Sequence, residues 1–294
     1  MIQNDNIRGI VLIVTAMAFF ALTDTFVKLA SETLPKGQVL FFMGAGCGLI
    51  FAALTLAKRH AIFARDYLHP GMIARNMMEI VATFSFITAL KFVGLSMTSA
   101  IIQATPLAVT LAAIVLLRER VGWRRWGAIL VGLFGVLVIL RPGLEGFNIH
   151  ALWAVLSLFA LAMRDVLTRV VPDDTPSTRI AFYAMTSLAL AGALHMALIA
   201  PPVAISGRAA AYLGAMIVFG SLGYYSMVQA MRTGEISVVA PFRYARILFA
   251  LSLGYVVFNE HPDMLTYVGA AITIAAGIYA FWREARLARQ MAQD

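Results

Sequence analysis

The sequence predicts an all-α integral membrane protein with ten transmembrane helices, arranged as two five-helix repeats of inverted topology. Three observations predict this fold class. The composition is strongly apolar, ten apolar stretches have about the length of a membrane span, and a pattern of residues recurs after about 141 positions. Together they indicate a membrane protein built by duplication of one unit.

The composition is that of a membrane protein. Hydrophobic residues make up 61% of the 294 residues and charged residues only 13%, and the mean hydropathy is +0.83. A soluble domain is about half apolar and about a quarter charged, so this chain has too few charges to coat a water-facing surface. The net charge of +8 does not indicate a nucleic-acid partner, because the basic residues stand in short clusters between apolar runs.

Ten apolar stretches can cross a hydrocarbon core of about 30 Å, which takes about 20 helical residues. In chain order they are roughly 8–30, 37–57, 71–92, 96–117, 124–140, 149–170, 178–200, 209–231, 236–258 and 263–283. The links between them are short and leave no room for a soluble domain. Each run is continuously apolar, whereas the strands of a membrane barrel alternate in polarity, so helices are favoured.

Lys and Arg residues in the links predict the orientation. Fourteen of them lie on the side that carries the N-terminus, and four lie on the opposite side, Lys36, Lys91, Arg141 and Arg208. Because basic residues concentrate on the cytoplasmic side of a membrane protein, we expect both termini to be cytoplasmic.

The chain contains its pattern twice. The residues of the first copy are Asp24, Lys28, Pro35, Gly94, Glu119, Gly127 and Gly135, and those of the second are Asp165, Arg169, Pro176, Gly234, Glu260, Gly269 and Gly277. We therefore expect one five-helix repeat over 1–145 and a second, with a short basic cytoplasmic tail, over 146–294. Five is an odd number of spans, so the second repeat enters the membrane upside down, the architecture that permits alternating access around a midplane site.

Eight charged residues fall inside the predicted spans: Lys28, Arg75, Arg164, Arg243, Arg246, Asp24, Glu79 and Asp165. Each isolated charge at the centre of a span costs about 2.5–3.5 kcal/mol, so such residues pair with one another or face a polar cavity. Spacing of four residues predicts pairs on one helix face for Asp24 with Lys28, Arg75 with Glu79, and Asp165 with Arg169.

Arg243 and Arg246 are the strongest candidates for substrate binding. They lie three residues apart on one face of the ninth span, with Tyr244 between them in sequence and Pro241 just upstream to interrupt the helix. Two interpretations stay open: the arginines bind substrate directly, or Glu79 and Asp165 from other helices neutralise them. The remaining candidates for the walls of the site are Arg75, Arg164, Gln103, Tyr224 and Tyr225. Candidates for binding a coupling proton are Glu79, Asp165 and Asp24.

The motifs of several enzyme classes are absent from the sequence. No Lys follows a Gly, so there is no phosphate-binding loop of an ATP motor, and neither the dinucleotide-binding glycine pattern nor a zinc-protease motif occurs. The single cysteine, Cys47, excludes an internal disulfide and a thiolate metal cluster. We therefore expect neither an enzyme nor a metal or cofactor site.

The chain resembles the drug/metabolite transporter superfamily of the EamA type over essentially its full length. The matching residues are Pro106-Leu107, Leu116-Leu117-Arg118-Glu119-Arg120, Trp126-Gly127 and Gly132-x2-Gly135, with Phe258-Asn259-Glu260, Gly269 and Gly277 in the second copy. The second copy departs from the pattern by carrying Arg246 in place of the usual proline. The Arg164-Asp165 segment with Gln103-x2-Pro106 is similar to members assigned to vitamin or S-adenosylmethionine uptake, and other members export amino acids.

The resemblance implies a secondary transporter of the bacterial inner membrane with a central cavity lined by helices 1, 3, 4, 6, 8 and 9. With its buried charges of both signs, we expect the substrate to be a small zwitterionic or partly anionic metabolite, such as an amino acid, riboflavin or S-adenosylmethionine. The alternatives are a lipid-modifying membrane enzyme and an anion-selective channel. Expected partners are the substrate and the lipid bilayer. A monomer suffices for transport, and a homodimer is compatible with it.

Overall fold

The computed structural model describes residues 2–116, 122–142, 147–172, 174–233 and 236–291, and in these ranges it contains helices and no strand. The long helices are α1 (Ile2–Thr33), α2 (Lys36–Ala57), α3 (Pro70–Ile102), α5 (Trp123–Leu140), α6 (Leu152–Thr168), α7 (Ser177–Leu198), α8 (Gly207–Thr233) and α11 (Met264–Met291). The shorter ones are η1 (Arg65–Leu68), α4 (Thr105–Leu116), η2 (Ile149–Ala151), α9 (Ile236–Val239), η3 (Ala240–Ala245) and α10 (Arg246–Phe258).

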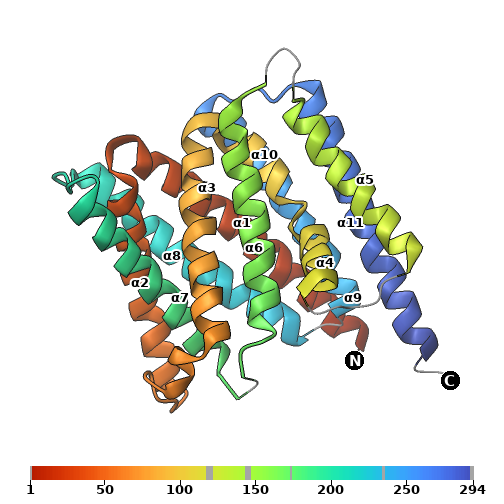
Figure 1. Cartoon of the computed structure of the whole chain (residues 1–294), viewed down its shortest axis with the longest axis horizontal. Helices are drawn as coiled ribbons and strands as arrows, with labels where there is room; N and C mark the ends of the chain where they lie inside the picture. The colour runs from red at the N-terminus through yellow and green to blue at the C-terminus, as the bar shows by residue number, and fades with distance from the viewer. Residues whose placement is uncertain (1, 117–121, 143–146, 173, 234–235, 292–294) are drawn as a thin grey trace.

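The prediction of an all-helical membrane protein is confirmed. Eight helical segments of the described chain are long and apolar enough to span a membrane, and two shorter apolar helices, Thr105–Leu116 and Trp126–Leu140, accompany them. These ten segments correspond to the ten apolar stretches of the sequence. The start of α1 and the end of α11 lie on the same side of the bundle (Figure 1).

The predicted boundary between the third and fourth spans needs correction. Helix α3 continues past the expected end at residue 92 and runs to Ile102, with a break at Gly94, whose φ of 87° only glycine adopts readily. The fourth span is therefore divided into the last turns of α3 and the separate helix α4. Thr105 and Pro106 open α4, and a proline is accepted in the first turn of a helix because the amide there has no partner within the helix.

The ninth span is interrupted in the same way. The stretch predicted as one helix over 236–258 consists of the short α9, the 3-10 helix η3 and then α10. Pro241 lies in the first turn of η3, where its missing amide hydrogen prevents a continuous α-helix. Both interrupted spans thus expose backbone groups within the bundle, which proteins tolerate in a membrane where the chain lines a polar interior.

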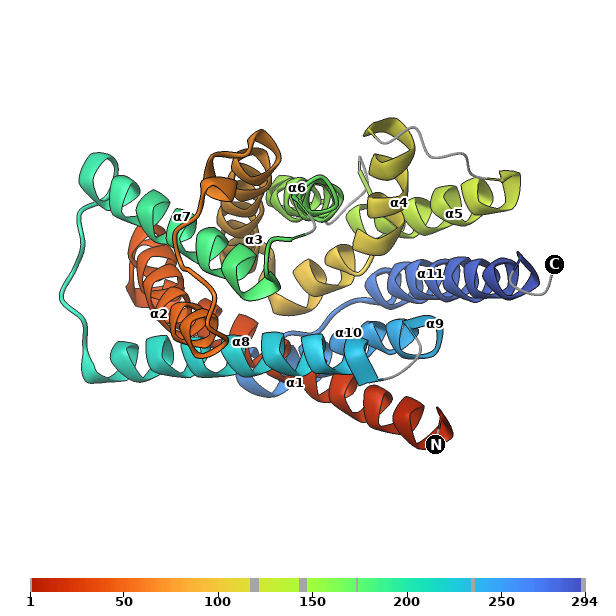
Figure 2. The ribbon, with the colours of Figure 1, turned by 90° about the horizontal axis from the view of Figure 1, so that it is seen from below.

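Helix pairing organises the molecule. The most extensive contacts join α1 with α8, α2 with α7, α3 with α6, and α5 with α11. In both ribbon views the α5–α11 pair and the α2–α7 pair lie at opposite ends of the long axis (Figures 1 and 2). Apolar clusters fill the spaces between the pairs, one around Leu158 and Ile139 and another around Leu40 and Leu90.

Two side-chain hydrogen bonds join residues about one repeat length apart in the chain. The Gln103 amide donates to the Tyr244 carbonyl oxygen at 3.0 Å, and these residues are 141 positions apart. The Thr273 hydroxyl donates to the Gly132 carbonyl oxygen at 3.1 Å, again across 141 positions. Each bond links the first half of the chain to a residue within one position of its match in the second half.

Candidate functional site

An ion network joins α3 to α6 in the interior of the bundle. The Glu79 carboxylate lies 2.9 Å from the Arg75 guanidinium one turn earlier on α3 and 3.1 Å from the Arg164 guanidinium on α6. Arg164 also contacts its neighbour Asp165 at 2.7 Å. The predicted Arg75–Glu79 pair is confirmed. Although Arg164 and Asp165 start on different helix faces, the long arginine side chain reaches round the helix and binds two carboxylates.

The predicted pair of Asp24 with Lys28 within the first helix is wrong. Asp24 is bound by Arg246 of α10 at 2.6 Å, and Arg246 also lies over the Phe20 ring, 5.7 Å from its centroid. Lys28 instead forms an ion pair with Glu260, beyond the end of α10. Both partners lie in the second half of the chain, so the first helix is held to that half by two ion pairs. The pairing of Asp165 with Arg169 stays a prediction.

Arg243 differs from the other arginines of the site. It lies in η3, among the helices, within electrostatic range of Asp165, Arg164 and Arg246. Within the described part of the chain it forms no ion pair and no side-chain hydrogen bond. Its side chain is nevertheless exposed. An arginine with these properties is ready to bind an anionic group.

Tyr244 and Gln103 fix the backbone on either side of the two arginines. Tyr244 is 6% exposed, and its hydroxyl packs against Gly277 of α11, where a Cβ atom would stand 1.7 Å from the hydroxyl oxygen. Gln103 is 7% exposed and binds the Tyr244 carbonyl oxygen. These two residues hold η3 against α3 and α11, and their predicted contact with a substrate stays a prediction.

The two tyrosines of α8 that were predicted to line the site have different surroundings. Tyr224 stacks edge-on against Phe51, with ring centroids 4.8 Å apart, and its hydroxyl donates to the Ser177 carbonyl oxygen at 3.2 Å. It is also within electrostatic range of Arg75, so it borders the ion network. Tyr225 is 54% exposed and forms none of the contacts that join the network.

The contacts of Glu260 are a feature that the sequence did not predict. Its carboxylate accepts hydrogen bonds from the backbone amides of Leu95 and Ser96, both at 2.7 Å, just after the break at Gly94. Burial alone would raise the pKa of Glu260, but the hydrogen bonds from Lys28, Ser96 and Leu95 outweigh it and hold the pKa below its ordinary value. The sequence did show that a Glu recurs at this position in both copies. In the structure, the Glu260 carboxylate binds the backbone amides that follow the break at Gly94.

Two hollows lie outside the ion network. One, of about 330 Å³, is next to Glu260 and is lined by residues of α3, the end of α5 and the α10–α11 link. In that link, Asp263 pairs with Arg141 and accepts the Thr266 amide of α11. The other, of about 390 Å³, lies between α5 and α11. Neither is lined by the charged residues of the ion network on α3 and α6 or by Asp24, Arg243 and Arg246.

Comparison with known proteins assigns the chain to a family. The model of the EamA-like transporter family matches it twice, at residues 7–141 and 148–282. The chain belongs to this family. The expected membership of the drug/metabolite transporter superfamily is thereby confirmed, and the chain is a multi-pass membrane protein of a transporter family.

Several curated relatives match over nearly their whole length. The S-adenosylmethionine uptake transporter of Rickettsia prowazekii is 24% identical over 95% of this chain and 94% of its own. The pseudopaline exporter CntI of Pseudomonas aeruginosa is 26% identical over 92% and 94%. The riboflavin transporter of Vibrio cholerae is 24% identical over 98% of each chain. A solved crystal structure with 19% identity has a TM-score of 0.64 over 98% of this chain and 99% of its own, which supports the fold.

Proposed function

We propose that this protein is a secondary transporter that moves a small zwitterionic or partly anionic metabolite across the bacterial inner membrane by alternating access. The substrate's anionic group binds Arg243. Glu79 and Asp165, or Asp24, take part by binding a cationic group of the substrate or a coupling proton. Both termini are cytoplasmic, in keeping with the excess of basic residues on that side.

The observation that carries this proposal is the charge balance around Arg243. Four arginines, Arg75, Arg164, Arg243 and Arg246, lie with three carboxylates, Glu79, Asp165 and Asp24. Three of the arginines are engaged by those carboxylates, which leaves one positive charge at an exposed Arg243. A charge within a membrane span is expensive to keep uncompensated, so a single anionic group on the substrate is the chemically matched ligand. Lys28 does not count here, because Glu260 neutralises it.

The arrangement of helices supports the inverted duplication. In the duplication, α1 corresponds to α6, α2 to α7, α3 to α8 and α5 to α11. Exchanging corresponding helices turns the α1–α8 pair into the α3–α6 pair and leaves the α2–α7 and α5–α11 pairs unchanged. Residues related by a two-fold axis touch each other only near that axis, and the contacts Gln103–Tyr244 and Thr273–Gly132 lie within one residue of such pairs. Each repeat has five spans, so the axis lies in the plane of the membrane, an arrangement that permits alternating access.

A substrate whose carboxylate binds Arg243 belongs to a narrower class of compounds than the relatives' names include. Their names include S-adenosylmethionine, pseudopaline and riboflavin, and both uptake and export. S-adenosylmethionine and amino acids carry a carboxylate that a guanidinium can bind through two parallel hydrogen bonds. Riboflavin carries none. We therefore place S-adenosylmethionine and amino acids before riboflavin as candidate substrates for this chain.

Uptake into proteoliposomes tests the proposal. A thermal-shift screen of S-adenosylmethionine, amino acids and riboflavin first selects a ligand, since a compound that binds the folded state raises its apparent stability. Uptake of that ligand is then compared for Arg243→Ala, Arg243→Lys and the wild type. We expect Arg243→Ala to lose at least about 90% of uptake, because a charge-assisted bond is worth about 1.5–3 kcal/mol, and Arg243→Lys to retain part of it.

Arg208→Ala is the matched control, because Arg208 is an exposed arginine at the start of α8, outside the ion network. It should transport like the wild type. Undiminished uptake by Arg243→Ala in correctly inserted protein would remove Arg243 from the site. Saturable counterflow separates a carrier from an anion channel, and net movement of unmodified solute separates it from a lipid-modifying enzyme.

A further inference from the structure

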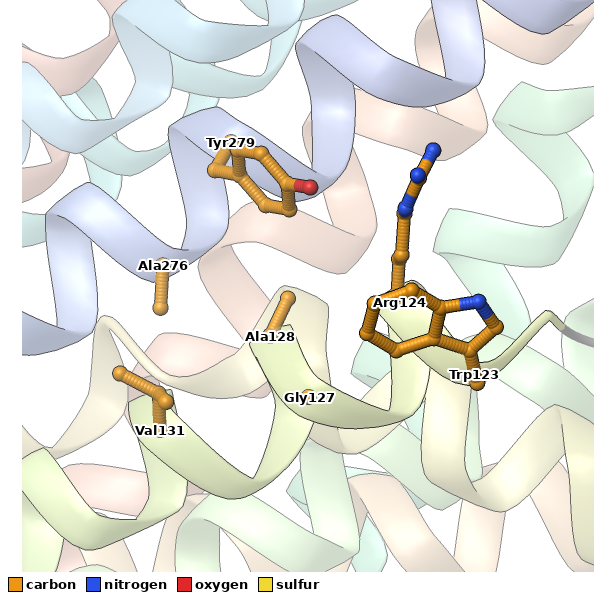
Figure 3. A pocket seen from close by; sticks show the side chains of 7 residues that line it. All are labelled: Trp123, Arg124, Gly127, Ala128, Val131, Ala276 and Tyr279. Atoms are coloured by element: carbon orange, nitrogen blue, oxygen red, sulfur yellow. The ribbon is translucent and has the colours of Figure 1, made fainter.

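The hollow between α5 and α11 has the form of an amphipathic groove. It has a volume of about 390 Å³ and is lined by Trp123, Arg124, Gly127, Ala128, Val131, Ala276 and Tyr279. Figure 3 shows that Trp123 and Arg124 of α5 lie at one end of the groove, with the Tyr279 hydroxyl of α11 pointing towards them. The rest of the lining is apolar. The groove is thus polar at one end and apolar along the rest of its length.

Small residues create the space. A Cβ atom added to Gly127 would meet no heavy atom within 4 Å, so this position is open rather than packed. Ala128 and Ala276 continue the floor of the groove on the two helices. Beyond it, Leu130 and Phe134 of α5 are 62% and 58% exposed, so an apolar track leads on along the same helix. A hydrocarbon chain fits such a surface.

The polar end carries a cation with interfacial aromatic residues. The Arg124 guanidinium lies 5.1 Å from the centroid of the Trp123 ring, and within the described part of the chain it has no acidic partner. Trp123 and Tyr279 are 78% and 43% exposed. Trp and Tyr at the ends of membrane helices lie at the level of the lipid headgroups, which places the Arg124 charge beside the headgroup phosphates.

We propose that this groove binds an anionic phospholipid of the cytoplasmic leaflet. Arg124 binds the headgroup phosphate, Tyr279 offers its hydroxyl to the headgroup, and one acyl chain lies over Gly127, Ala128 and Val131. Basic grooves between helices on the cytoplasmic side attract anionic lipids for this reason. The sequence supports that side, because basic residues concentrate at the end of the bundle where α5 begins.

Charge also argues against a second copy of the chain as the occupant. A two-fold dimer would bring the same groove of each copy together. The groove residues include a cation and no acid, so such a contact would bury two Arg124 side chains near each other without compensation. A phospholipid supplies the missing negative charge together with the apolar chain.

The test measures lipid binding directly and does not depend on transport. Protein in detergent is titrated with phosphatidylglycerol or phosphatidylcholine, and bound lipid is counted by native mass spectrometry. Gly127→Leu fills the groove, and Gly214→Leu is its matched control, since Gly214 is a helical glycine of α8 that also has nothing within 4 Å. Arg124→Ala removes the charge, and Lys58→Ala is the control at an exposed basic residue of the same predicted side.

We expect the wild type and both controls to bind phosphatidylglycerol in preference to phosphatidylcholine. Arg124→Ala should bind phosphatidylglycerol about fivefold more weakly, the effect of one basic residue at an anionic surface, and Gly127→Leu should lose the bound lipid. Equal retention in Gly127→Leu and the wild type, or no preference between the two lipids, would overturn the proposal. So would a dimer that Gly127→Leu converts to monomer without change in bound lipid.

Discussion

At the scale of single residues, the ion pair between Asp24 and Arg246 shows how charges in the interior of the bundle are neutralised. The two side chains meet at 2.6 Å with side-chain exposures of 8% and 24%. Such a pair contributes little compared with an apolar pair of similar shape, because both ions lose their hydration. Removing only one partner is costly, since the other is left buried and uncompensated.

A double-mutant cycle tests this view of Asp24. Asp24→Asn and Arg246→Met should each destabilise the protein by about 3–5 kcal/mol, while the double variant should recover a large part of that loss. Apparent melting temperatures in one detergent give the comparison. If the losses of the two single variants simply add, the two residues do not stabilise each other.

The sequence predicted pairs only where both residues belong to one helix. Arg75 and Glu79 lie one turn apart on α3, so their spacing sufficed. Asp24 and Lys28 have the same spacing but different partners, because Arg246 and Glu260 approach them from the second half of the chain. Spacing along a helix carries no information about which other helix faces it. The eight charges within the predicted spans were therefore recognisable from sequence, and most of their partners were not.

At the scale of elements, the contacts between Glu260 and the backbone next to Gly94 stabilise the break in α3. The break in α3 turns two backbone amides outwards, and Glu260 accepts both while its other contact is Lys28. A Cβ atom on Gly94 would stand 2.5 Å from a Glu260 carboxylate oxygen. The glycine is therefore required twice, once for its positive φ and once for the close approach of the carboxylate.

Gly94→Ala should destabilise the protein by at least about 1–3 kcal/mol, the cost of holding a non-glycine residue in a disfavoured backbone region. Gly214→Ala is the control, because this glycine lies within α8 and has free space around it. The control should be stabilised by up to about 1 kcal/mol, since Ala is the better helix former. Thermal melting of both variants checks the contrast. Similar melting of the two would show that the Gly94 break carries no constraint.

The Glu260 contacts also predict a dependence on pH. Because the pKa of Glu260 is lowered in the folded protein, its contribution to stability is complete above the unfolded value of about 4.3 and is lost as the pH falls through the folded pKa. The melting temperature of Glu260→Gln should therefore lie below that of the wild type at about pH 7, with the gap closing in acid. Asp66 and Asp263, whose pKa values are also lowered, act equally in both proteins and cancel in the difference.

The helix boundaries show what periodicity alone resolves. Apolar length predicted the helical segments well: eight are long enough to span a membrane, and the other two are shorter apolar helices. It failed at the interruptions, since Leu95–Ile102 and α4 together read as one apolar run, as do η3 and α10. Gly94 and Pro241 were visible in the sequence, but their effect depends on the contacts that replace the lost helical hydrogen bonds.

At the scale of the whole molecule, the predicted orientation can be tested with single cysteines. Replacing Cys47 by Ala removes the only native thiol. Ala61→Cys and Ala204→Cys then place one thiol in an exposed link at each side of the bundle. In intact cells a membrane-impermeant maleimide should label residue 204 and leave residue 61 unlabelled. The reverse pattern would invert the orientation, and with it the leaflet assigned to the α5–α11 groove.

The duplication was the strongest global signal of the sequence, and the contacts across 141 positions give it a geometric meaning. Repeated residues such as Asp24 and Asp165 indicated two copies, because acidic residues in apolar spans are too costly to recur by chance. The repeat could not indicate where the two copies differ in their ion-pair partners. Asp24 is engaged by Arg246, while Asp165 is engaged by Arg164 of its own helix.

The unmatched positive charge at Arg243 has an electrical consequence for a carrier of this kind. A substrate with a net charge of −1 makes the loaded site neutral, whereas the empty site is charged, so the membrane voltage acts on the return of the empty carrier. Moving one elementary charge through the full potential is worth about 2.3 kcal/mol per 100 mV. Exchange of one such anion for another would then be insensitive to voltage and its net flux would respond to voltage, whereas a zwitterion leaves the charge of the carrier unchanged and its net flux would not respond.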